Sequence, residues 1–386
     1  MSALFPTYAR WEVNPKRGIG SVLIDAEGKE YLDFIQGIAV SNLGHCHPKV
    51  QAAVEEQLGL LWHTSNLFQI EGQERVAQLL TEHSVGDYAF FCNSGAEANE
   101  AAIKLARKAT GKHHIVSMKN SFHGRTLGTL AATGQEKVQI GFGPLLSGFT
   151  YVPLNDSESL KTAVSEKTAA IMVEVVQGEG GVIPMSPGYA EELKRICKEY
   201  NCLLIIDEIQ TGIGRTGTAF AYEQFGLSPD IITLAKGLGN GFPVGAMIGK
   251  SPLKDAFSPG SHGSTFGGNP LAMAAAEAVL TEIFDSIFLQ SVQQKGKWFK
   301  ELLQQNLGSL EIVEEVRGAG LIIGIACHIE VDSIITACRE QGLLVLPAGP
   351  KVVRLLPPLN VTEQDLEKAL AIIEKIFTSI DDEQRK

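Results

Sequence analysis

Two short apolar runs of the chain each end on an ionisable residue. Residues 203–206 are Leu-Leu-Ile-Ile and precede Asp207, and the apolar residues 231–235 precede Lys236. Runs this short, rich in β-branched residues and apolar on both faces, are typical of buried parallel strands. Because ligands of open α/β sheets bind beyond the carboxyl ends of the strands, we expect Asp207 and Lys236 to face one site.

A third stretch has the chemistry of an anion-binding site. The apolar residues 89–92 give way to Asn93-Ser94-Gly95-Ala96, and a helix is predicted over residues 98–109. A helix that begins at such a turn leaves backbone amides free and directs the positive end of its dipole at one point. The turn therefore suits a phosphate, although an ordinary N-cap at Ser94 without a ligand explains the same residues.

Together, these three features predict a pyridoxal phosphate site. A lysine that forms a Schiff base with an aldehyde must be neutral, and desolvation lowers the pKa of a lysine. A carboxylate beside a pyridine nitrogen keeps that nitrogen protonated, so that the ring withdraws electrons from the substrate carbon. Taken alone, Lys236 would be interpreted as a solvated loop residue, because glycines follow it. The phosphate turn and Asp207 in the same domain favour the cofactor.

Two other motifs are interpreted as structural. Residues 212–217 match G-x-G-x-x-G, but residues 207–211 separate them from the strand, and Asp230 precedes a strand where a ribose-binding acid should follow one. We therefore expect a backbone turn in place of a dinucleotide site. His45-Cys46-His47 lacks the second ligand pair that structural zinc requires, so we expect a loop and no metal.

The composition argues against several classes of partner. The chain has 33 Lys and Arg against 44 Asp and Glu, a net charge of −11, so neither nucleic acid nor a membrane is expected to bind it. The six cysteines are scattered without paired spacing, which is typical of a reducing compartment. No apolar stretch reaches roughly 18 residues, and the N-terminus lacks the pattern of a signal peptide. We expect a cytoplasmic location.

The order of predicted elements indicates an α/β fold. From residue 88 onward, short apolar strands alternate with helices, which is the pattern of a parallel sheet flanked by helices. At 386 residues the chain exceeds what one hydrophobic core usually holds, so a second, smaller domain is expected. We expect an N-terminal part over residues 1–45, a large domain over residues 46–270, and linking helices with an α+β unit over residues 271–386.

Four runs resemble the subgroup-III (ω-amino-acid) aminotransferases. They are, in chain order, residues 94–99 (SGAEAN), 121–126 (SFHGRT), 207–212 (DEIQTG) and 234–237 (LAKG). Residues 63–67 and 263–270 are most similar to the members of this group that use acetylornithine. The resemblance extends from about Tyr8 to Phe377. It implies a pyridoxal phosphate enzyme of fold type I, with a mostly parallel central sheet, helices on both of its faces, and a small domain made from both chain termini.

The resemblance also implies how the cofactor is held. Lys236 would carry it as a Schiff base and transfer protons, and Asp207 would pair with the pyridine nitrogen. Ser94, Gly95 and Ala96 would form the phosphate turn.

By the same comparison, Gln210 would hydrogen-bond the ring hydroxyl, and the ring would lie between Phe122 and Ile209. Thr265 would reach the phosphate of the partner subunit's cofactor, which implies a homodimer with shared active sites. Ser264 is a candidate for the substrate site.

Arginine and glutamate residues are implied as the groups that select substrates. Arg125 and Arg354 are candidate carboxylate clamps, because the planar guanidinium of arginine binds a carboxylate through two parallel hydrogen bonds. Arg354 would hold the α-carboxylate of glutamate or 2-oxoglutarate. Glu179 matches the position of a glutamate that pairs with this arginine and moves aside for glutamate, and its flanking glycines would permit that movement.

The implied reaction transfers the δ-amino group of N2-acetylornithine to 2-oxoglutarate. Succinylornithine, ornithine, 4-aminobutyrate and N-succinyl-diaminopimelate remain open as donors, because the sequence does not fix the acyl group. An aminomutase, a decarboxylase and a non-catalytic binding or regulatory protein could also have this fold. Arg354 together with Glu179 favours a transaminase with two substrates, and Lys236 with Asp207 disfavours a non-catalytic protein.

Overall fold

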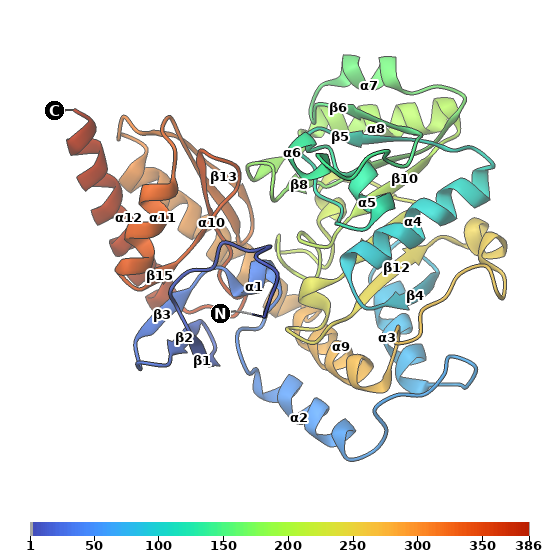
Figure 1. Cartoon of the computed structure of the whole chain (residues 1–386), viewed down its shortest axis with the longest axis horizontal. Helices are drawn as coiled ribbons and strands as arrows, with labels where there is room; N and C mark the ends of the chain where they lie inside the picture. Colours follow the sequence, from blue (N-terminus) through green and yellow to red (C-terminus); the bar gives the residue numbers. More distant parts are fainter. Residues whose placement is uncertain (1–2, 386) are drawn as a thin grey trace.

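A seven-stranded sheet forms the centre of the molecule in the computed structural model, which describes residues 3–385 (Figure 1). Its strand order is β4-β12-β11-β10-β7-β5-β6. The strands are β4 (Tyr88–Cys92), β5 (His114–Met118), β6 (Phe149–Val152), β7 (Thr168–Val173), β10 (Leu203–Asp207), β11 (Ile231–Leu234) and β12 (Gly245–Gly249).

The strand directions confirm the predicted parallel sheet. β10 pairs in parallel with β11 on one side and with β7 on the other, so the carboxyl ends of all three strands meet at one edge. Only β12 runs opposite to the rest, pairing antiparallel with both β11 and β4. β12 was not predicted, and neither was β6.

Helices cover both faces of this sheet, as predicted. On one face, Ile205 packs in a cluster with Ala101 and Leu105 of α4 (Gly95–Thr110). On the other face, Leu204 and Ile206 belong to a cluster that includes side chains of α8 (Pro187–Tyr200). Because consecutive residues of one strand face different clusters, the strands must be apolar throughout. The further helices of this region are α2 (Pro48–Leu58), α3 (Glu71–Glu82), α5 (Leu127–Ala132), α6 (Glu136–Gln139), α7 (Ser157–Ala163), α9 (Pro270–Ile283), and the 3-10 helices η1 (Ala221–Phe225), η2 (Lys236–Leu238) and η3 (Ser251–Phe257).

The two ends of the chain lie together beside the central sheet, in blue and red in Figure 1. β15 pairs in parallel with β3, so an early and a late segment share one sheet. That sheet consists of β1 (Pro15–Ile19), β2 (Val22–Asp25), β3 (Glu30–Asp33) and β15 (Leu343–Leu344), and it adjoins the short, kinked α1 (Gln36–Ala39). Within it, β2 and β3 pair antiparallel as a hairpin. The domain boundaries after residues 45 and 270 remain predictions.

A second four-stranded sheet, with the order β13-β14-β17-β16, completes this part of the molecule. It consists of β13 (Val313–Ala319), β14 (Ile322–Cys327), β16 (Leu346–Pro347) and β17 (Val352–Leu355), packed with α10 (Ser286–Leu307), α11 (Asp332–Glu340) and α12 (Glu363–Gln384). Thr362 caps α12 by accepting a hydrogen bond from the backbone amide of Asp365 at 3.1 Å. The Asp365 carboxylate accepts a hydrogen bond from the Ser21 hydroxyl at 2.7 Å, which ties the start of α12 to the turn between β1 and β2.

The G-x-G-x-x-G run forms a buried turn. Gly214 and Gly217 have φ values of +80° and +93°, which favour glycine. Between them, the buried Arg215 donates to the carbonyl oxygens of Leu321 and Pro357 and to Asn42 Oδ1. The turn therefore joins the central sheet to both ends of the chain.

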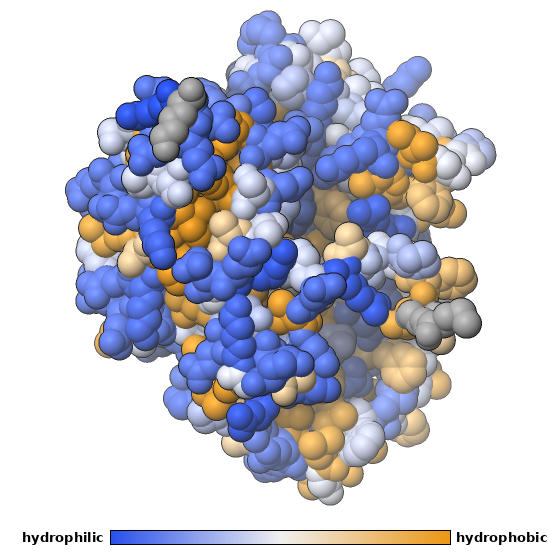
Figure 2. Space-filling view, turned by 60° about the vertical axis from the view of Figure 1, so that its left-hand side comes forward, coloured by the Kyte–Doolittle hydropathy of each residue, from blue (hydrophilic) through white to orange (hydrophobic). Residues whose placement is uncertain are grey.

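The surface carries an apolar region at the lower end of the molecule, where Figure 1 places α2 (Figure 2). Its exposed side chains include Leu60, Trp62, Leu67 and Phe68 in the loop that follows α2. Among residues 3–385, no helix has the length and apolar character needed to cross a membrane.

Candidate active site

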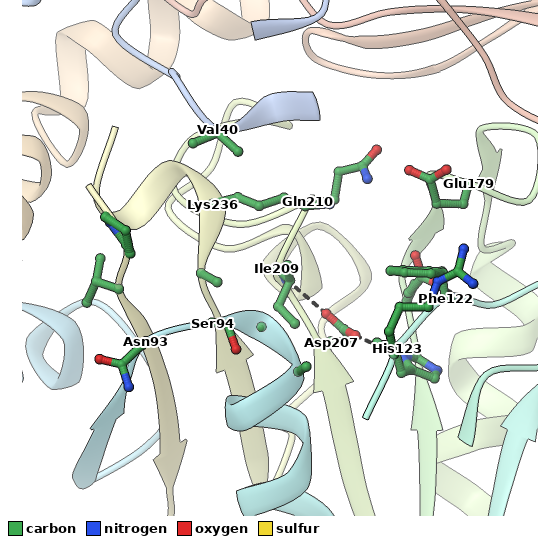
Figure 3. Close-up of a pocket in the computed structure, with 18 of the residues that line it drawn as sticks. Val40, Asn93, Ser94, Phe122, His123, Glu179, Asp207, Ile209, Gln210 and Lys236 are labelled. Carbon is green, nitrogen blue, oxygen red and sulfur yellow. Dashed lines mark hydrogen bonds and ion pairs between the residues drawn. The ribbon is translucent and has the colours of Figure 1, made fainter. Parts of the chain in front are cut away.

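A cavity of about 470 Å³ lies beyond the carboxyl ends of β10 and β11, where the sequence predicted a site. Figure 3 shows Asp207 near the end of its strand and the Lys236 side chain extending toward Gln210. The cavity is lined by Val40, Asn93, Ser94, Gly95, Ala96, Phe122, His123, Gly124, Arg125, Glu174, Glu179, Asp207, Ile209, Gln210, Ala235, Lys236, Gly241, Phe242, Pro243 and Val244.

Asp207 is buried and surrounded by hydrogen-bond donors. Its Oδ2 accepts from His123 Nδ1 at 2.7 Å and from Asn99 Nδ2 at 2.8 Å, and its Oδ1 accepts from the amide of Ile209 at 3.0 Å. Burial alone would lower the pKa of His123, but its hydrogen bond and attraction to Asp207, together with Glu174, raise that pKa overall. These donors suit a carboxylate anion, which could in turn hold a cationic ring nitrogen.

Lys236 has the properties that a nucleophilic lysine requires. Burial lowers its pKa and nearby Arg354 adds to this effect, whereas Glu179, Asp207 and Glu174 oppose it. A lowered pKa increases the fraction of neutral amine, the form that attacks an aldehyde. The backbone of Lys236 lies in the left-handed region with φ of +44°, a conformation that is uncommon outside glycine and clusters at functional sites.

The predicted phosphate turn begins α4. Ser94 is the N-cap, and its hydroxyl accepts from the amide of Glu97 at 3.2 Å. Gly95 and Ala96 are the first helical residues, and amides at these positions lack acceptors within the helix. A Cβ at Gly95 would lie only 2.7 Å from Ile209 Cδ1 and 3.1 Å from Ile209 Cγ2, so a larger residue here would force the turn or the Ile209 side chain to shift. Lys236, Asp207 and this turn could therefore hold a cofactor with an aldehyde, a ring nitrogen and a phosphate.

Two of the candidate substrate residues, Arg354 and Glu179, form an ion pair beside the cavity. Arg354 is 1% exposed, and its Nη1 donates to Glu179 Oε1 at 2.7 Å and to Gln210 Oε1 at 3.0 Å. Arg354 does not itself line the cavity, whereas its two partners do. Burial raises the pKa of Glu179, but the charge and hydrogen bond of Arg354 outweigh burial and lower it overall.

Three other predicted residues lie differently. Arg125 is exposed on the cavity wall, with its guanidinium carbon 5.6 Å from the centre of the Phe122 ring. Ser264 and Thr265 are not part of the wall. The Ser264 hydroxyl accepts from Asn93 Nδ2 at 3.1 Å, and Thr265 is exposed. Within one chain, neither residue reaches the cavity.

Sequence reasoning assigned no role to two buried residues of the wall, His123 and Glu174. Glu174 directly follows β7, and its Oε1 accepts from the amide of Phe122 at 2.9 Å. Burial raises the pKa of Glu174 to about 7. A signal was present, because Glu174 ends an apolar strand as Asp207 does. His123 lies within one of the runs that carried the resemblance.

Comparison with known proteins places the chain in a family. A family model described as aminotransferase class-III matches residues 6–377. The chain belongs to the aminotransferase class-III family. An acetylornithine aminotransferase of Halalkalibacterium halodurans is 64% identical over 377 residues, which cover 98% of each chain.

Two solved aminotransferase structures have closely similar folds. N-acetylornithine aminotransferase of Stenotrophomonas maltophilia has a TM-score of 0.85 and 36% identity, with 97% of each chain covered. An ornithine aminotransferase of Toxoplasma gondii, described with pyridoxal phosphate in partial occupancy at its active site, has a TM-score of 0.95 and 33% identity. The alignment covers 100% of this chain and 94% of that one. These structures confirm the predicted α/β fold.

The close packing of the phosphate turn predicts the effect of a small substitution. Gly95→Ala should weaken pyridoxal phosphate binding about tenfold, because the added methyl group would push the turn away from Ile209. Gly188→Ala on α8 is the matched control, since a Cβ there meets no atom within 4 Å. Absorbance titration of the two apoproteins measures the affinity, and equal dissociation constants would contradict the predicted role of the turn.

Proposed function

We propose that this chain is a transaminase that moves the δ-amino group of N2-acetylornithine to 2-oxoglutarate, giving N-acetylglutamate 5-semialdehyde and glutamate, as a step of arginine biosynthesis. The observation that carries the proposal is the Glu179–Arg354 ion pair at the end of the cavity that contains Lys236. An ion pair that can open lets one pocket accept two different donors. Acetylornithine would leave the pair closed, whereas glutamate would open it and place its α-carboxylate on Arg354. The identity of 64% with an acetylornithine aminotransferase supports the choice of donor.

Pyridoxal phosphate is the cofactor that these residues fit. When bound, it supplies an aldehyde that accepts an amine and a cationic ring that withdraws electrons from the reacting carbon. Lys236 Nζ would hold the aldehyde, Asp207 would hold the ring nitrogen, and the amides of Gly95 and Ala96 would hold the phosphate. The hydrogen bond from His123 Nδ1 to Asp207 Oδ2 would keep this carboxylate in place for the ring nitrogen.

The remaining wall residues would orient the ring and move protons. Phe122 and Ile209 would cover its two faces, and the amide of Gln210 would donate to its hydroxyl. Once Lys236 is free, its Nζ is the base that takes the proton from the carbon bearing the transferred amine.

Two arginines would hold the substrates' carboxylates. Arg125, exposed on the cavity wall, would bind the α-carboxylate of acetylornithine while the δ-amino group lies at Lys236. When glutamate binds, Glu179 would leave Arg354, which would then bind the α-carboxylate of glutamate. Ornithine is the main alternative donor, because an ornithine aminotransferase has a fold that matches with the higher TM-score, 0.95 against 0.85.

We also infer a homodimer with shared active sites, located in the cytoplasm. The loop that follows α2 exposes Trp62, Leu67 and Phe68, and it contacts the segment of Thr265 through a hydrogen bond from Asn66 Nδ2 to Ser264 O at 3.1 Å. Thr265 is exposed beside this apolar surface, where it could reach a partner's phosphate site. A mass of one chain, 41.5 kDa, in light scattering at assay concentrations would contradict the dimer.

The six cysteines are free thiols, which suits a reducing cytoplasm.

Single-turnover absorbance tests the proposed reaction. Protein loaded with pyridoxal phosphate should be yellow, should bleach on addition of acetylornithine and should recover its colour on addition of 2-oxoglutarate. Ornithine and 4-aminobutyrate, added in parallel at the same concentration, should bleach it more slowly. Bleaching by ornithine alone would contradict the assigned donor.

Removing the Glu179 carboxylate should change the preference between the two donors. In Glu179→Ala, Arg354 loses the competing ion pair, so kcat/KM for glutamate should rise relative to that for acetylornithine by about tenfold. Stopped-flow measurement of each half-reaction gives this ratio. An unchanged ratio in an active Glu179→Ala enzyme would show that Glu179 is not a switch.

A further inference from the structure

The loop that carries Glu179 runs between two cavities. It covers residues 178–182 and joins β8 (Val176–Gln177) to β9 (Ile183–Pro184), which pair as a two-stranded sheet. Glu179 lines the candidate active site and also a second cavity of about 940 Å³, whose wall includes Gly181 and Arg317. Because Glu179 borders open space in both cavities, its position depends on the contacts that the neighbouring residues of the loop make.

Three residues of the sheet β13-β14-β17 lie in one row beneath this loop. β13 and β14 pair Arg317 with Gly324, and β14 and β17 pair Gly324 with Arg354. Directly paired residues of antiparallel strands project from the same face of a sheet. Arg317, Gly324 and Arg354 therefore form a row on one face, which we name the arginine row.

Arg317 binds the backbone of the loop. Its Nε and Nη2 donate to the carbonyl oxygen of Gly181 at 2.9 and 2.7 Å, two residues beyond Glu179. Its Nη1 donates to Glu315 Oε1 at 2.6 Å, which orients the guanidinium group. Gly181 has φ of +117°, so the carbonyl is presented in a conformation that favours glycine. Both hydrogen bonds are charge-assisted, which makes them stronger than those between neutral groups.

Gly324, the middle residue of the row, makes room for the loop. A Cβ at Gly324 would lie 2.8 Å from the Cβ of Val182, so the loop lies directly on the sheet at this point. Val182 is fully buried and has φ of +52°, an uncommon conformation for a β-branched residue. The sheet therefore fixes the loop at Val182 and Gly181, while Glu179 reaches Arg354 at the far end of the same row.

We propose that Arg317 and Gly324 are positioning residues that set the amino-donor preference by holding Glu179 against Arg354. Neither residue lines the candidate active-site cavity, so neither would touch the substrate there. A loop that is released from Arg317 pairs less often with Arg354, and the freed guanidinium then binds the α-carboxylate of glutamate more readily. This inference deepens the proposed function and rests on it.

Amide hydrogen exchange tests the positioning without any substrate. In the holoenzyme, Arg317→Ala should increase the exchange rate of the peptide containing residues 178–182 about tenfold. Arg195→Ala is the matched control, because within residues 3–385 the ion pairs of this exposed arginine of α8 are with glutamates of its own helix. Arg317→Lys, which keeps the charge but loses the two-pronged contact, should give an intermediate rate. Unchanged exchange in Arg317→Ala would overturn the proposal.

The ratio of the two half-reactions tests the effect on specificity. Arg317→Ala and Gly324→Ala should each raise kcat/KM for glutamate relative to acetylornithine by about fivefold, whereas Arg195→Ala should not. In a Glu179→Ala background, Arg317→Ala should add no further change, because its effect acts through Glu179. Faster exchange with an unchanged ratio, or an equal effect of Arg317→Ala in the Glu179→Ala background, would overturn the assigned role.

The two measurements distinguish a wrong donor assignment from a wrong role for Arg317. If the unsubstituted enzyme does not react with acetylornithine, the assigned donor is wrong, yet hydrogen exchange still reports whether Arg317 holds the loop. If Arg317→Ala does not yield folded protein, Arg317→Lys and Gly324→Ala carry both measurements. An unchanged exchange rate and an unchanged ratio in these two variants would overturn the proposal.

Discussion

Burial of one negative charge organises the candidate site. Asp207 lies at the carboxyl end of a strand that is apolar on both faces, where an unpartnered carboxylate would be costly. Its charge is balanced by donors from three separate segments: Asn99 of α4, His123 of the loop after β5, and the amide of Ile209. Asn99 in turn accepts a hydrogen bond from Thr233 of β11.

The need to balance the Asp207 charge explains why the candidate cofactor-binding residues lie together. The helix that donates Asn99 begins at the Ser94 turn, and the strand that contains Thr233 leads directly to Lys236. Compensation of the buried charge therefore fixes the relative positions of a phosphate turn, a ring partner and a nucleophile. Two of the residues that would select substrates, Arg354 and Glu179, belong to a different frame. Arg354 lies on the sheet β13-β14-β17, and the loop of Glu179 rests on that same sheet. The two frames meet at Gln210, whose Oε1 accepts a hydrogen bond from Arg354 Nη1.

The residues that were predictable from sequence are those whose position follows from a single strand or turn. Asp207 and Lys236 follow short apolar runs, and parallel strands bring such ends together whatever the rest of the fold does. Glu174 also follows an apolar strand, but Val175 and Val176 come next, so no change from apolar to polar residues marks the end of the strand there. β12 has glycines at both ends and runs against its neighbours, a direction that alternation of strands and helices does not reveal.

Long-range contacts were beyond prediction for a different reason. Arg317 binds the backbone carbonyl of Gly181, 136 residues away in the chain. Every residue has a backbone carbonyl, so the sequence does not indicate which one accepts this hydrogen bond. The row that it forms with Gly324 and Arg354 depends on the register of three strands, which single-strand patterns do not fix. The roles of Ser264 and Thr265 remain predictions, because one chain does not bring either residue to its own cavity.

The most direct measurement follows the transferred nitrogen atom. N2-acetylornithine labelled with ¹⁵N at the δ position is incubated with the holoenzyme and 2-oxoglutarate, and the products are identified by NMR. Transamination through Lys236 predicts that the label appears in the α-amino group of glutamate, one equivalent for each donor consumed, and that Lys236→Ala abolishes the transfer. Label that stays in the donor or is released as ammonia would contradict the central claim.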